Sequence, residues 1–271
     1  MTLFDFRAGD TPLLVNVPHA GTEVPDAIAA RLTPAARVLP DTDWFVDELY
    51  RFAYDMGASM QVARFSRYVV DLNRPPDDAA LYPGQAQIGL CPVRTFAGEE
   101  IYLAGTAPDA AEQRRRVELF WRPYHDHLAA QLETIRARHG CVVLWDAHSI
   151  RSKVPGLFDG RLPDLNLGTN DGVSCAPGLR KLVTGICASS FRFSSVVDGR
   201  FRGGHITRDY GRPDAGCHAL QMELAQAAYM DEVPGATFDS SHAAKLGALL
   251  HMLLAAVLAW CACRGSRPAP E

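Results

Sequence analysis

The stretch from Val142 to Ser149 constrains the fold of this chain more than any other. Its first four residues are apolar, two of them are β-branched, and an amphipathic helical pattern precedes them. Such a run predicts a strand buried on both faces of a mixed or parallel sheet. In open α/β sheets, ligands bind beyond the carboxyl ends of the strands, so Asp146 and His148 stand where a site is expected. A histidine at one strand end can also be a simple hydrogen-bonding cap, and other parts of the chain have to decide between the two.

The length and pattern of the chain predict a single α/β domain. There are 271 residues, of which 48% are apolar and 21% charged, and neither a repeat nor a linker is visible. We therefore expect one domain over residues 1–271, with 265–271 as a frayed tail. The sequence does not predict an oligomeric state.

Charge and motif content argue against several function classes. The formal net charge is -4 and no block of Lys and Arg occurs, so the clustered cations that nucleic-acid binding requires are missing. A Gly-x-Ser-x-Gly elbow is absent, which leaves a serine hydrolase with little support. A Gly-x-x-x-x-Gly-Lys-Ser/Thr loop is absent as well, which argues against use of ATP or GTP.

The cysteines and the chain ends indicate where the protein works. Seven cysteines are irregularly spaced and form no Cys-x-x-Cys pair, which argues against a disulfide framework and a zinc knuckle. The first residues lack a basic segment followed by an apolar core, so we expect a cytoplasmic protein. The most apolar window, Leu246 to Cys263, is marginal in length for a membrane span. We expect it to be a C-terminal helix packed on the domain, and we expect no membrane partner.

The remaining secondary structure follows from periodicity and from breaking residues. Strands are predicted over residues 13–17, 60–65, 68–72, 142–147 and 165–168, the last at an edge of the sheet, and helices over 44–56, 109–139, 177–190 and 240–263. Residues 195–204 are predicted to form glycine-rich turns. The irregular segments 76–108 and 151–163 are long for a compact domain, and loops of this kind are usually functional or form a lid.

Three separate segments carry side chains that could bind a metal ion. The first predicted strand ends at His19, and the central strand ends at His148. Between them, the carboxylates Asp41 and Asp43 precede a helix. Two histidines and one carboxylate are the usual ligand set of a catalytic zinc site with an open position. The chain has nine histidines, so other trios are possible.

Arginines next to predicted strands offer a second constellation. They are Arg67, Arg74, Arg202, Arg208 and Arg212. Several guanidinium groups that converge on one pocket would suit a substrate with two carboxylates. The alternative is that each is a solvated surface arginine.

Glu223 is the third candidate, because it interrupts the short apolar run of residues 219–224. It either faces the surface from an amphipathic segment or is a partly buried acid with a raised pKa. A buried carboxyl group of that kind suits general acid–base hydrolysis. The pattern alone leaves both readings open.

Five segments together resemble the N-formylglutamate amidohydrolase family, the deformylases that end one route of histidine degradation. The segments are Pro18-His19-Ala20-Gly21, Asp41-Thr42-Asp43-Trp44, residues 66–75, Asp146-Ala147-His148-Ser149 and residues 203–208. The resemblance covers roughly residues 10 to 260. It implies a fold similar to the zinc carboxypeptidases and aspartoacylase, with three α/β/α layers around a central mixed sheet.

The resemblance also implies roles for individual residues. His19 and His148 would bind one zinc ion, with Asp41 as the third ligand and Glu23 or Asp43 as the alternative carboxylate. Cobalt, manganese, nickel or iron could replace zinc at such ligands. Asp146 would orient an imidazole from outside the ligand set.

The resemblance implies the remaining roles on the substrate side. Arg67, Asn73, Arg74, His205 and Arg208 would contact the substrate. Glu223 would act as the general base.

The activity that the resemblance implies is metal-dependent hydrolysis of N-formyl-L-glutamate to formate and L-glutamate. One alternative is a zinc amidohydrolase that acts on another acidic N-acyl amino acid or peptide. Another, from a different class, is a binding protein that recognises an acidic metabolite without turning it over.

Overall fold

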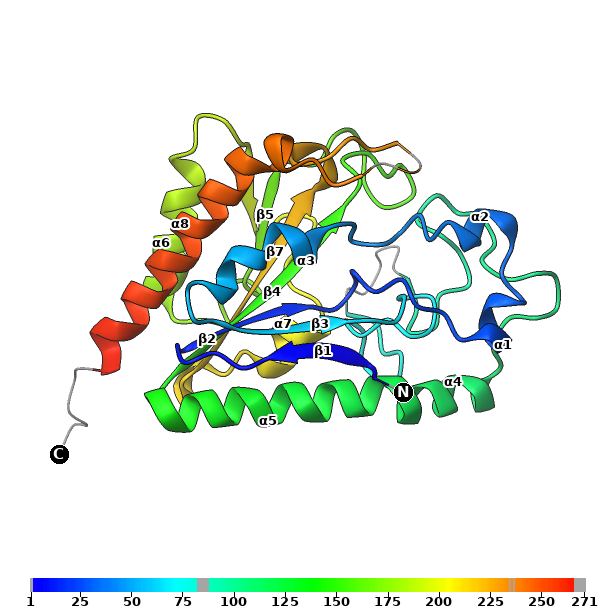
Figure 1. Cartoon of the computed structure of the whole chain (residues 1–271), viewed down its shortest axis with the longest axis horizontal. Coiled ribbons are helices and arrows are strands. Elements are labelled where there is room, and N and C mark those ends of the chain that lie inside the picture. Colours follow the sequence, from blue (N-terminus) through cyan, green and yellow to red (C-terminus); the bar gives the residue numbers. More distant parts are fainter. Residues whose placement is uncertain (1, 82–87, 234, 236, 266–271) are drawn as a thin grey trace.

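A mixed seven-stranded sheet forms the centre of the molecule (Figure 1). The structure is a computed structural model and describes residues 2–81, 88–233, 235 and 237–265. The strands are β1 (Phe4–Arg7), β2 (Leu13–Val17), β3 (Ser59–Ala63), β4 (Val142–Ile150), β5 (Leu165–Gly168), β6 (Ser195–Val197) and β7 (Cys217–Ala225). Their order across the sheet is β1-β3-β2-β4-β7-β5-β6. The β1–β3 and β5–β7 pairs are antiparallel, and the other pairs are parallel.

The central strand β4 confirms the prediction made for its sequence. All nine of its residues are buried, and it lies between the parallel strands β2 and β7. Such a strand has helices on both sides, so its side chains alternate between two cores rather than between core and solvent. Val143 and Trp145 enter one core, and Val142 and Leu144 enter the other.

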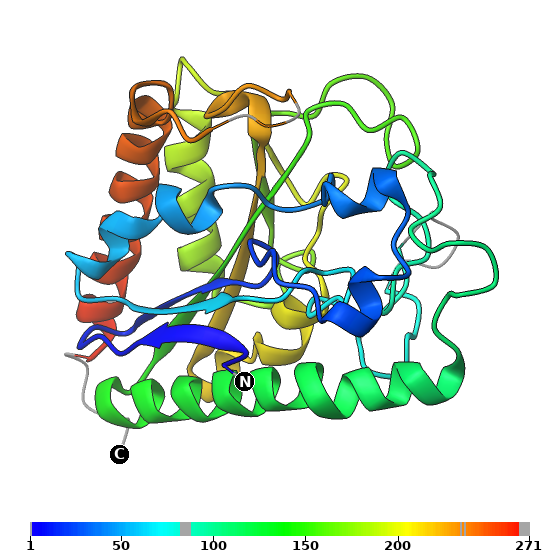
Figure 2. The same ribbon diagram turned by 45° about the vertical axis from the view of Figure 1, so that its right-hand side comes forward.

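Helices cover both faces of the sheet, which makes three layers. The α-helices are α1 (Asp26–Ala29), α2 (Pro34–Arg37), α3 (Val46–Leu49), α4 (Ala110–Arg116), α5 (Arg122–His139), α6 (Pro177–Ala188), α7 (His205–Tyr210) and α8 (Ser240–Gly265). Shorter turns are η1 (Arg51–Tyr54), the π-helical η2 (Val117–Trp121), η3 (Pro213–Ala215) and η4 (Gln226–Ala228). Residues of α3, α6 and α8 build one core, and residues of α1, α5 and α7 build the other. In Figures 1 and 2, α5 runs along one side of the sheet, and α6 and α8 lie together on the opposite side.

The C-terminal helix packs on the domain, as its sequence predicts. Its segment Ser240–Cys263 is long and apolar enough, by length and composition, to cross a membrane. Leu246, Leu250 and Leu253 are nevertheless buried in the core that α6 shares, while Met252 is exposed on the other side. The helix extends to Gly265, the first residue of the predicted tail. The rest of that tail, residues 266–271, lies outside the described residues.

Several elements differ from the sequence-based expectation. The predicted helix over 44–56 is shorter, because Phe45 has a left-handed φ of 60° and α3 begins only after it. The predicted strand over 68–72 is wrong: this segment is irregular, and the Asp71 amide donates to the Leu90 carbonyl rather than to a neighbouring strand. Residues 195–197, predicted as turn, form the edge strand β6, so β5 lies inside the sheet rather than at its edge.

Candidate active site

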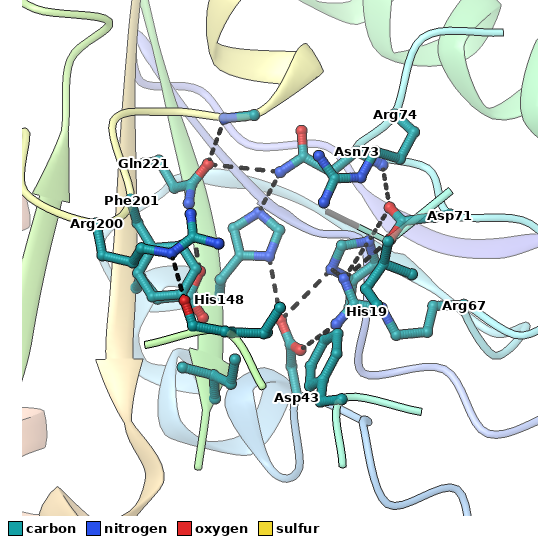
Figure 3. A pocket seen from close by; sticks show the side chains of 16 residues that line it. His19, Asp43, Arg67, Asp71, Asn73, Arg74, His148, Arg200, Phe201 and Gln221 are labelled. Carbon is teal, nitrogen blue, oxygen red and sulfur yellow. Dashed lines mark hydrogen bonds and ion pairs between the residues drawn. The ribbon is translucent and has the colours of Figure 1, made fainter. Parts of the chain in front are cut away.

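Two buried histidines meet at the carboxyl edge of neighbouring strands (Figure 3). His19 follows β2 by two residues, and His148 lies near the end of β4. Because β2 and β4 are parallel neighbours, their ends reach the same edge of the sheet. The two imidazole rings are 4.9 Å apart between centroids.

Asp43 completes a cluster with these histidines. Its Oδ2 lies 3.1 Å from Nδ1 of His148 and 3.7 Å from Nδ1 of His19. The main-chain amide of Ser149 donates to the same oxygen, and the Asp43 amide donates to the His19 carbonyl. One ligand atom from each of the three residues lies within 4.8 Å of the others, a spacing that could hold a metal ion.

Each histidine is oriented by a second carboxylate behind it. Nε2 of His19 lies 2.8 Å from Asp71 Oδ1, and Nε2 of His148 lies 2.9 Å from Asp146 Oδ2. A carboxylate only accepts, so each Nε2 carries a hydrogen toward the carboxylate behind it, and each Nδ1 lies on the side of Asp43. Metal-ligating histidines usually have this arrangement, with one nitrogen toward the ion and the other donating to a carboxylate. The residues present therefore fit a divalent ion.

Asp146 is itself held in place from the neighbouring strand. Asn16, paired in register with Asp146, donates to its Oδ1 at 2.8 Å, and Tyr124 donates to the Asn16 side chain at 2.6 Å. All three side chains are buried. This network supports the arrangement expected for Asp146, behind the imidazole of His148.

The charges of the cluster shift its pKa values strongly. Burial alone would lower the pKa of His148, but the Asp146 and Asp43 carboxylates outweigh it and raise that pKa well above its usual value. Burial would raise the pKa of Asp43, yet hydrogen bonds from His148 and His19 hold it well below the usual range. Three buried carboxylates, including Asp71, thus share this small volume with two imidazoles and one arginine. A bound cation would balance this excess of negative charge.

Glu223 lies beside the cluster on the next strand. It pairs in register with His148, and it is buried. Burial raises its pKa to about 8, with a further rise from the charge of Asp43. The side-chain amide of Gln221 donates to its Oε2 at 3.3 Å. The reading of Glu223 as a surface-facing residue is therefore wrong, and the reading as a buried acid is confirmed.

A pocket opens over these groups (Figure 3). Its lining combines the acidic and imidazole groups with three arginines and an apolar wall: His19, Asp43, Arg67, Asp71, Asn73, Arg74, Ile88, Phe96, His148, Ile150, Leu157, Arg200, Phe201, Gly204, Gln221 and Glu223. Such a lining can neutralise an anionic ligand at one end and contact its carbon chain at the other.

The three arginines of the pocket differ in their partners. Arg67 is committed to the cluster, since its Nη2 lies 3.1 Å from Asp71 Oδ2 and 2.9 Å from His19 Nδ1. Arg200 donates from Nε to the Leu157 carbonyl. Arg74 forms no ion pair with any carboxylate of the described residues, and its Nε is buried without a hydrogen-bond partner. Arg74 is therefore the pocket cation best suited to an anionic group of a ligand.

Two predicted metal ligands lie elsewhere. Asp41 does not join the histidines as expected, because its Oδ2 accepts from the Tyr68 hydroxyl at 2.7 Å and from the Phe96 amide at 3.0 Å. Glu23 pairs with Arg64 at the surface. The structure brings the alternative carboxylate, Asp43, to the histidines instead.

Two predicted substrate contacts also lie outside the pocket. His205 packs against the rings of Trp121 and His125, each 5.5 Å away between centroids. Arg208 donates from Nε to the Gly203 carbonyl. In the described part of the chain, neither residue lines the pocket, whereas Arg67, Asn73 and Arg74 do.

Sequence reasoning missed three residues of the site. Asp71 stands in the motif of residues 66–75, where the pattern predicts a strand and no site residue at this position. Gln221 precedes Glu223 by two residues, and this period of two places both on one face of β7. Arg200 lies in a glycine-rich segment and carries no local signal that separates it from Arg202 or Arg212.

Comparisons with known proteins agree in one family. The family model described as N-formylglutamate amidohydrolase matches residues 11–230. A Pseudomonas putida protein named N-formylglutamate deformylase is 49% identical over 265 residues, which cover 98% of this chain and 99% of the relative. A Pseudomonas aeruginosa protein of the same name is 48% identical over 258 residues, which cover 95% and 97%.

Two solved structures are similar in fold. The N-formylglutamate amidohydrolase from Ralstonia eutropha JMP134 has a TM-score of 0.82 at 24% identity, over 96% of this chain and 99% of the other. A gene product of Agrobacterium tumefaciens has a TM-score of 0.72 at 18% identity, over 95% of each chain. At these identities the likeness concerns the arrangement of the sheet and helices.

Proposed function

Because the chain belongs to the N-formylglutamate amidohydrolase family, we propose that it hydrolyses N-formyl-L-glutamate to formate and L-glutamate with the help of a divalent metal ion. The observation that carries the proposal is the position of Glu223. This buried acid stands in register with His148, one member of the buried cluster that could hold a metal ion.

His19, Asp43 and His148 would hold the ion, with zinc as the expected metal. Cobalt, manganese, nickel and iron accept the same ligands. A bound ion of this kind supplies Lewis-acid polarisation of the formyl carbonyl and of a water molecule. Asp71 and Asp146 would accept from Nε2 of the two imidazoles, which would leave each Nδ1 for the ion.

Glu223 would move the proton of the reaction. In its ionised form the carboxylate accepts a proton from the attacking water, and it then delivers this proton to the nitrogen of the leaving L-glutamate. A raised pKa makes the second transfer favourable, since the acid form is stable near neutral pH. Gln221 donates to the Glu223 carboxylate and limits its rotation.

The substrate carries two carboxylates, and we assign one of them to Arg74. Arg200, which comes from the segment after β6, is the second candidate cation. Arg67 would act mainly inside the cluster, because Asp71 already occupies its guanidinium. Asn73 would orient the site rather than the substrate: its Nδ2 lies 3.0 Å from His148 Nε2 and 3.4 Å from Asp146 Oδ2.

The apolar wall of the pocket would contact the methylene groups of the substrate. Phe96 comes from the segment 76–108, Leu157 from the segment 151–163, and Phe201 from the segment after β6. Phe201 and Leu157 also pack on a small core around Ile150. These three side chains would keep bulk water away from the substrate and select the side-chain length of the amino acid that carries the formyl group.

Three finer statements belong to the same proposal. A zinc-carboxypeptidase-like architecture, a place in histidine degradation and a cytoplasmic location are implied by the family resemblance. The three-layer arrangement around a mixed sheet supports the first of them.

Metal analysis combined with formate release tests the proposed function. We expect about one divalent ion per chain and formate release from N-formyl-L-glutamate, both abolished by dialysis against a chelator and restored by zinc. Bound metal with hydrolysis of N-acetyl-L-glutamate or an acidic peptide, and without formate release, would replace this function by another amidohydrolase activity. If the protein holds no metal and hydrolyses none of these substrates, it would be a binding protein for an acidic metabolite.

A further inference from the structure

The long helix that covers one face of the sheet is interrupted by a π turn. Residues Val117–Trp121 form η2 between α4 and α5, and the Arg122 amide donates to the Val117 carbonyl five residues earlier. Pro123 follows directly and has no amide hydrogen, so it cannot donate to an α-helical partner. π turns inside α-helices often occur at functional sites.

The π turn brings three polar side chains onto one side of the helix. Arg116, Trp121 and His125 are separated by five and then four residues. In an uninterrupted α-helix, five residues advance by about 500°, so Trp121 would point about 140° away from Arg116. The π turn holds one extra residue, which compensates for most of this angular offset. All three side chains therefore face the segment of residues 68–74.

The first contact comes from Arg116. Its side chain is almost fully buried, and its Nη1 donates to the carbonyls of Tyr68 and Val69 at 3.2 and 3.0 Å. Glu112 and the Tyr102 hydroxyl complete the surroundings of the guanidinium. These carbonyls lie outside the sheet, so a side-chain donor satisfies them.

The next two contacts reach Arg74, which lines the pocket, and Leu72, which lies between the pocket residues Asp71 and Asn73. Trp121 Nε1 donates to the Arg74 carbonyl at 2.9 Å, and His125 Nε2 lies 2.8 Å from the Leu72 carbonyl. Burial lowers the pKa of His125 to about 3, so the ring is neutral and Nε2 carries the hydrogen that the carbonyl accepts. The two rings stack with centroids 3.8 Å apart.

The segment is held from its other side by α7. The amides of His205 and Ile206 bind the main-chain carbonyl and the Oδ1 of Asn73, at 3.2 and 2.9 Å. Gly204 makes this approach possible, because a Cβ there would lie 2.4 Å from the Asn73 side chain. Residues 71–74 are therefore held between side chains of η2 and α5 on one side and the first amides of α7 on the other.

We propose that Trp121, placed by the π turn, is a positioning residue for Arg74. Its indole N–H fixes the main chain at Arg74, and this sets the direction from which the guanidinium enters the pocket. The inference rests on the proposed function in one respect, the assignment of a substrate carboxylate to Arg74. The indole also fills space between α5 and the segment, so the test has to separate the hydrogen bond from the ring.

Trp121→Phe keeps an aromatic ring and removes the N–H. We expect faster hydrogen–deuterium exchange in the peptide that spans residues 68–76, with exchange in β4 unchanged. For N-formyl-L-glutamate we expect KM to rise about tenfold, the loss of roughly one hydrogen bond, while kcat falls less than about threefold and the metal content stays constant. Leu119→Ala is the matched control, because Leu119 lies in the same turn with an exposed side chain.

A double-mutant cycle tests whether Trp121 acts through Arg74. In an Arg74→Gln background, Trp121→Phe should raise KM less than about twofold, because the guanidinium that it positions is gone. Binding of glutarate, measured by calorimetry, should show the same non-additivity without any turnover. A KM rise that is equal in both backgrounds would overturn the role proposed for Trp121.

The exchange experiment separates this inference from the proposed function. If Trp121→Phe exchanges faster than the wild type over residues 68–76, but the wild type releases no formate, only the proposed function is refuted. Unchanged exchange in an active Trp121→Phe enzyme would refute the positioning role. Should that variant not fold, Trp121→Met replaces it: its apolar side chain fills part of the same space and has no N–H to donate to Arg74, so unchanged exchange over 68–76 would again refute the positioning role.

Discussion

His148 on β4 and Glu223 on β7 occupy paired positions of two parallel strands. Side chains at paired positions point to the same face of a sheet, so the hydrogen-bond ladder alone places the acid next to the imidazole. Asp146 and Gln221 form the equivalent pair two residues earlier. The candidate proton-transfer group and one candidate metal ligand therefore stand on buried central strands of the sheet, while Arg74 and Arg200 come from loops.

Replacement of Glu223 by Gln should separate proton transfer from metal binding. The amide keeps the size of the side chain but cannot accept a proton, so we expect kcat to fall by about 10² to 10⁴ with the metal content unchanged. Steady-state formate release and atomic absorption measure the two quantities. The exposed Glu118→Gln is the control, and turnover near the wild-type rate in Glu223→Gln would remove the base assignment.

The same residue should make the metal-free protein less stable at alkaline pH. Its pKa is raised from 4.5 to about 8 in the folded chain, mainly by burial. The folded state then keeps a proton that the unfolded state releases, so this contribution to stability is complete below pH 4.5 and is lost as the pH rises through about 8. In urea unfolding of chelator-treated protein, the free energy of unfolding of Glu223→Gln should rise relative to that of the wild type between pH 5 and about 8.5. The rise should be on the order of a few kcal/mol. A difference in unfolding free energy between the variant and the wild type that stays constant with pH would contradict the raised pKa of Glu223.

Asp43 and Asp41 should respond differently to the same change. Asp43→Asn removes a carboxylate from the histidine cluster, and we expect the zinc affinity to fall at least about tenfold. Asp41→Asn should keep about one ion per chain and instead lower the melting temperature, because its carboxylate accepts from Tyr68 and Phe96. Competition with a chromogenic chelator measures the affinity. Loss of metal in Asp41→Asn alone would restore Asp41 as the third ligand.

Arg74 and Arg208 provide a matched pair for substrate recognition. Arg74→Gln should raise KM for N-formyl-L-glutamate at least about tenfold, since a charge-assisted bond to a carboxylate is lost. Arg208→Gln should change KM less than about threefold, because Arg208 does not line the pocket within the described residues. Initial rates over a range of substrate concentrations give KM for both variants. A larger rise in KM for Arg208→Gln than for Arg74→Gln would indicate that Arg208 contacts the substrate.

Removal of the metal should abolish activity without unfolding the chain. The three candidate ligands lie at strand ends and in a loop, while two apolar cores form the bulk of the fold. We expect a chelated sample to keep its circular dichroism spectrum and to regain formate release when zinc is added. A chelated protein that loses its helical signal would show that the ion is structural.

Much of the site could be predicted from local pattern. An apolar run followed by a histidine predicts a buried strand with a chemically capable end, and the structure brings His19 and His148 together at the ends of two buried strands. For Glu223, the apolar run that surrounds it is equally compatible with a buried acid and with a surface residue. Only the tertiary structure, in which β7 pairs between β4 and β5 and other elements pack on both faces of the sheet, shows that Glu223 is buried.

The loops could not be predicted in the same way. Asp41 and Asp43 stand two residues apart in one segment, and sequence spacing does not tell which carboxylate turns inward. Asp43 reaches His148 because its Oδ2 binds the Ser149 amide and its own amide binds the His19 carbonyl, contacts between segments far apart in the chain. Arg200 enters the pocket for the same kind of reason, through a carbonyl of the segment 151–163.

The sequence therefore determines the strands and their chemically capable ends, because alternation and apolar runs are properties of neighbouring residues. The tertiary structure decides which of several similar side chains meet. That choice depends on hydrogen bonds between distant segments, such as those that Trp121 and His125 make to residues 72–74. No local pattern records those bonds, since each exists only after the helix has packed on the sheet.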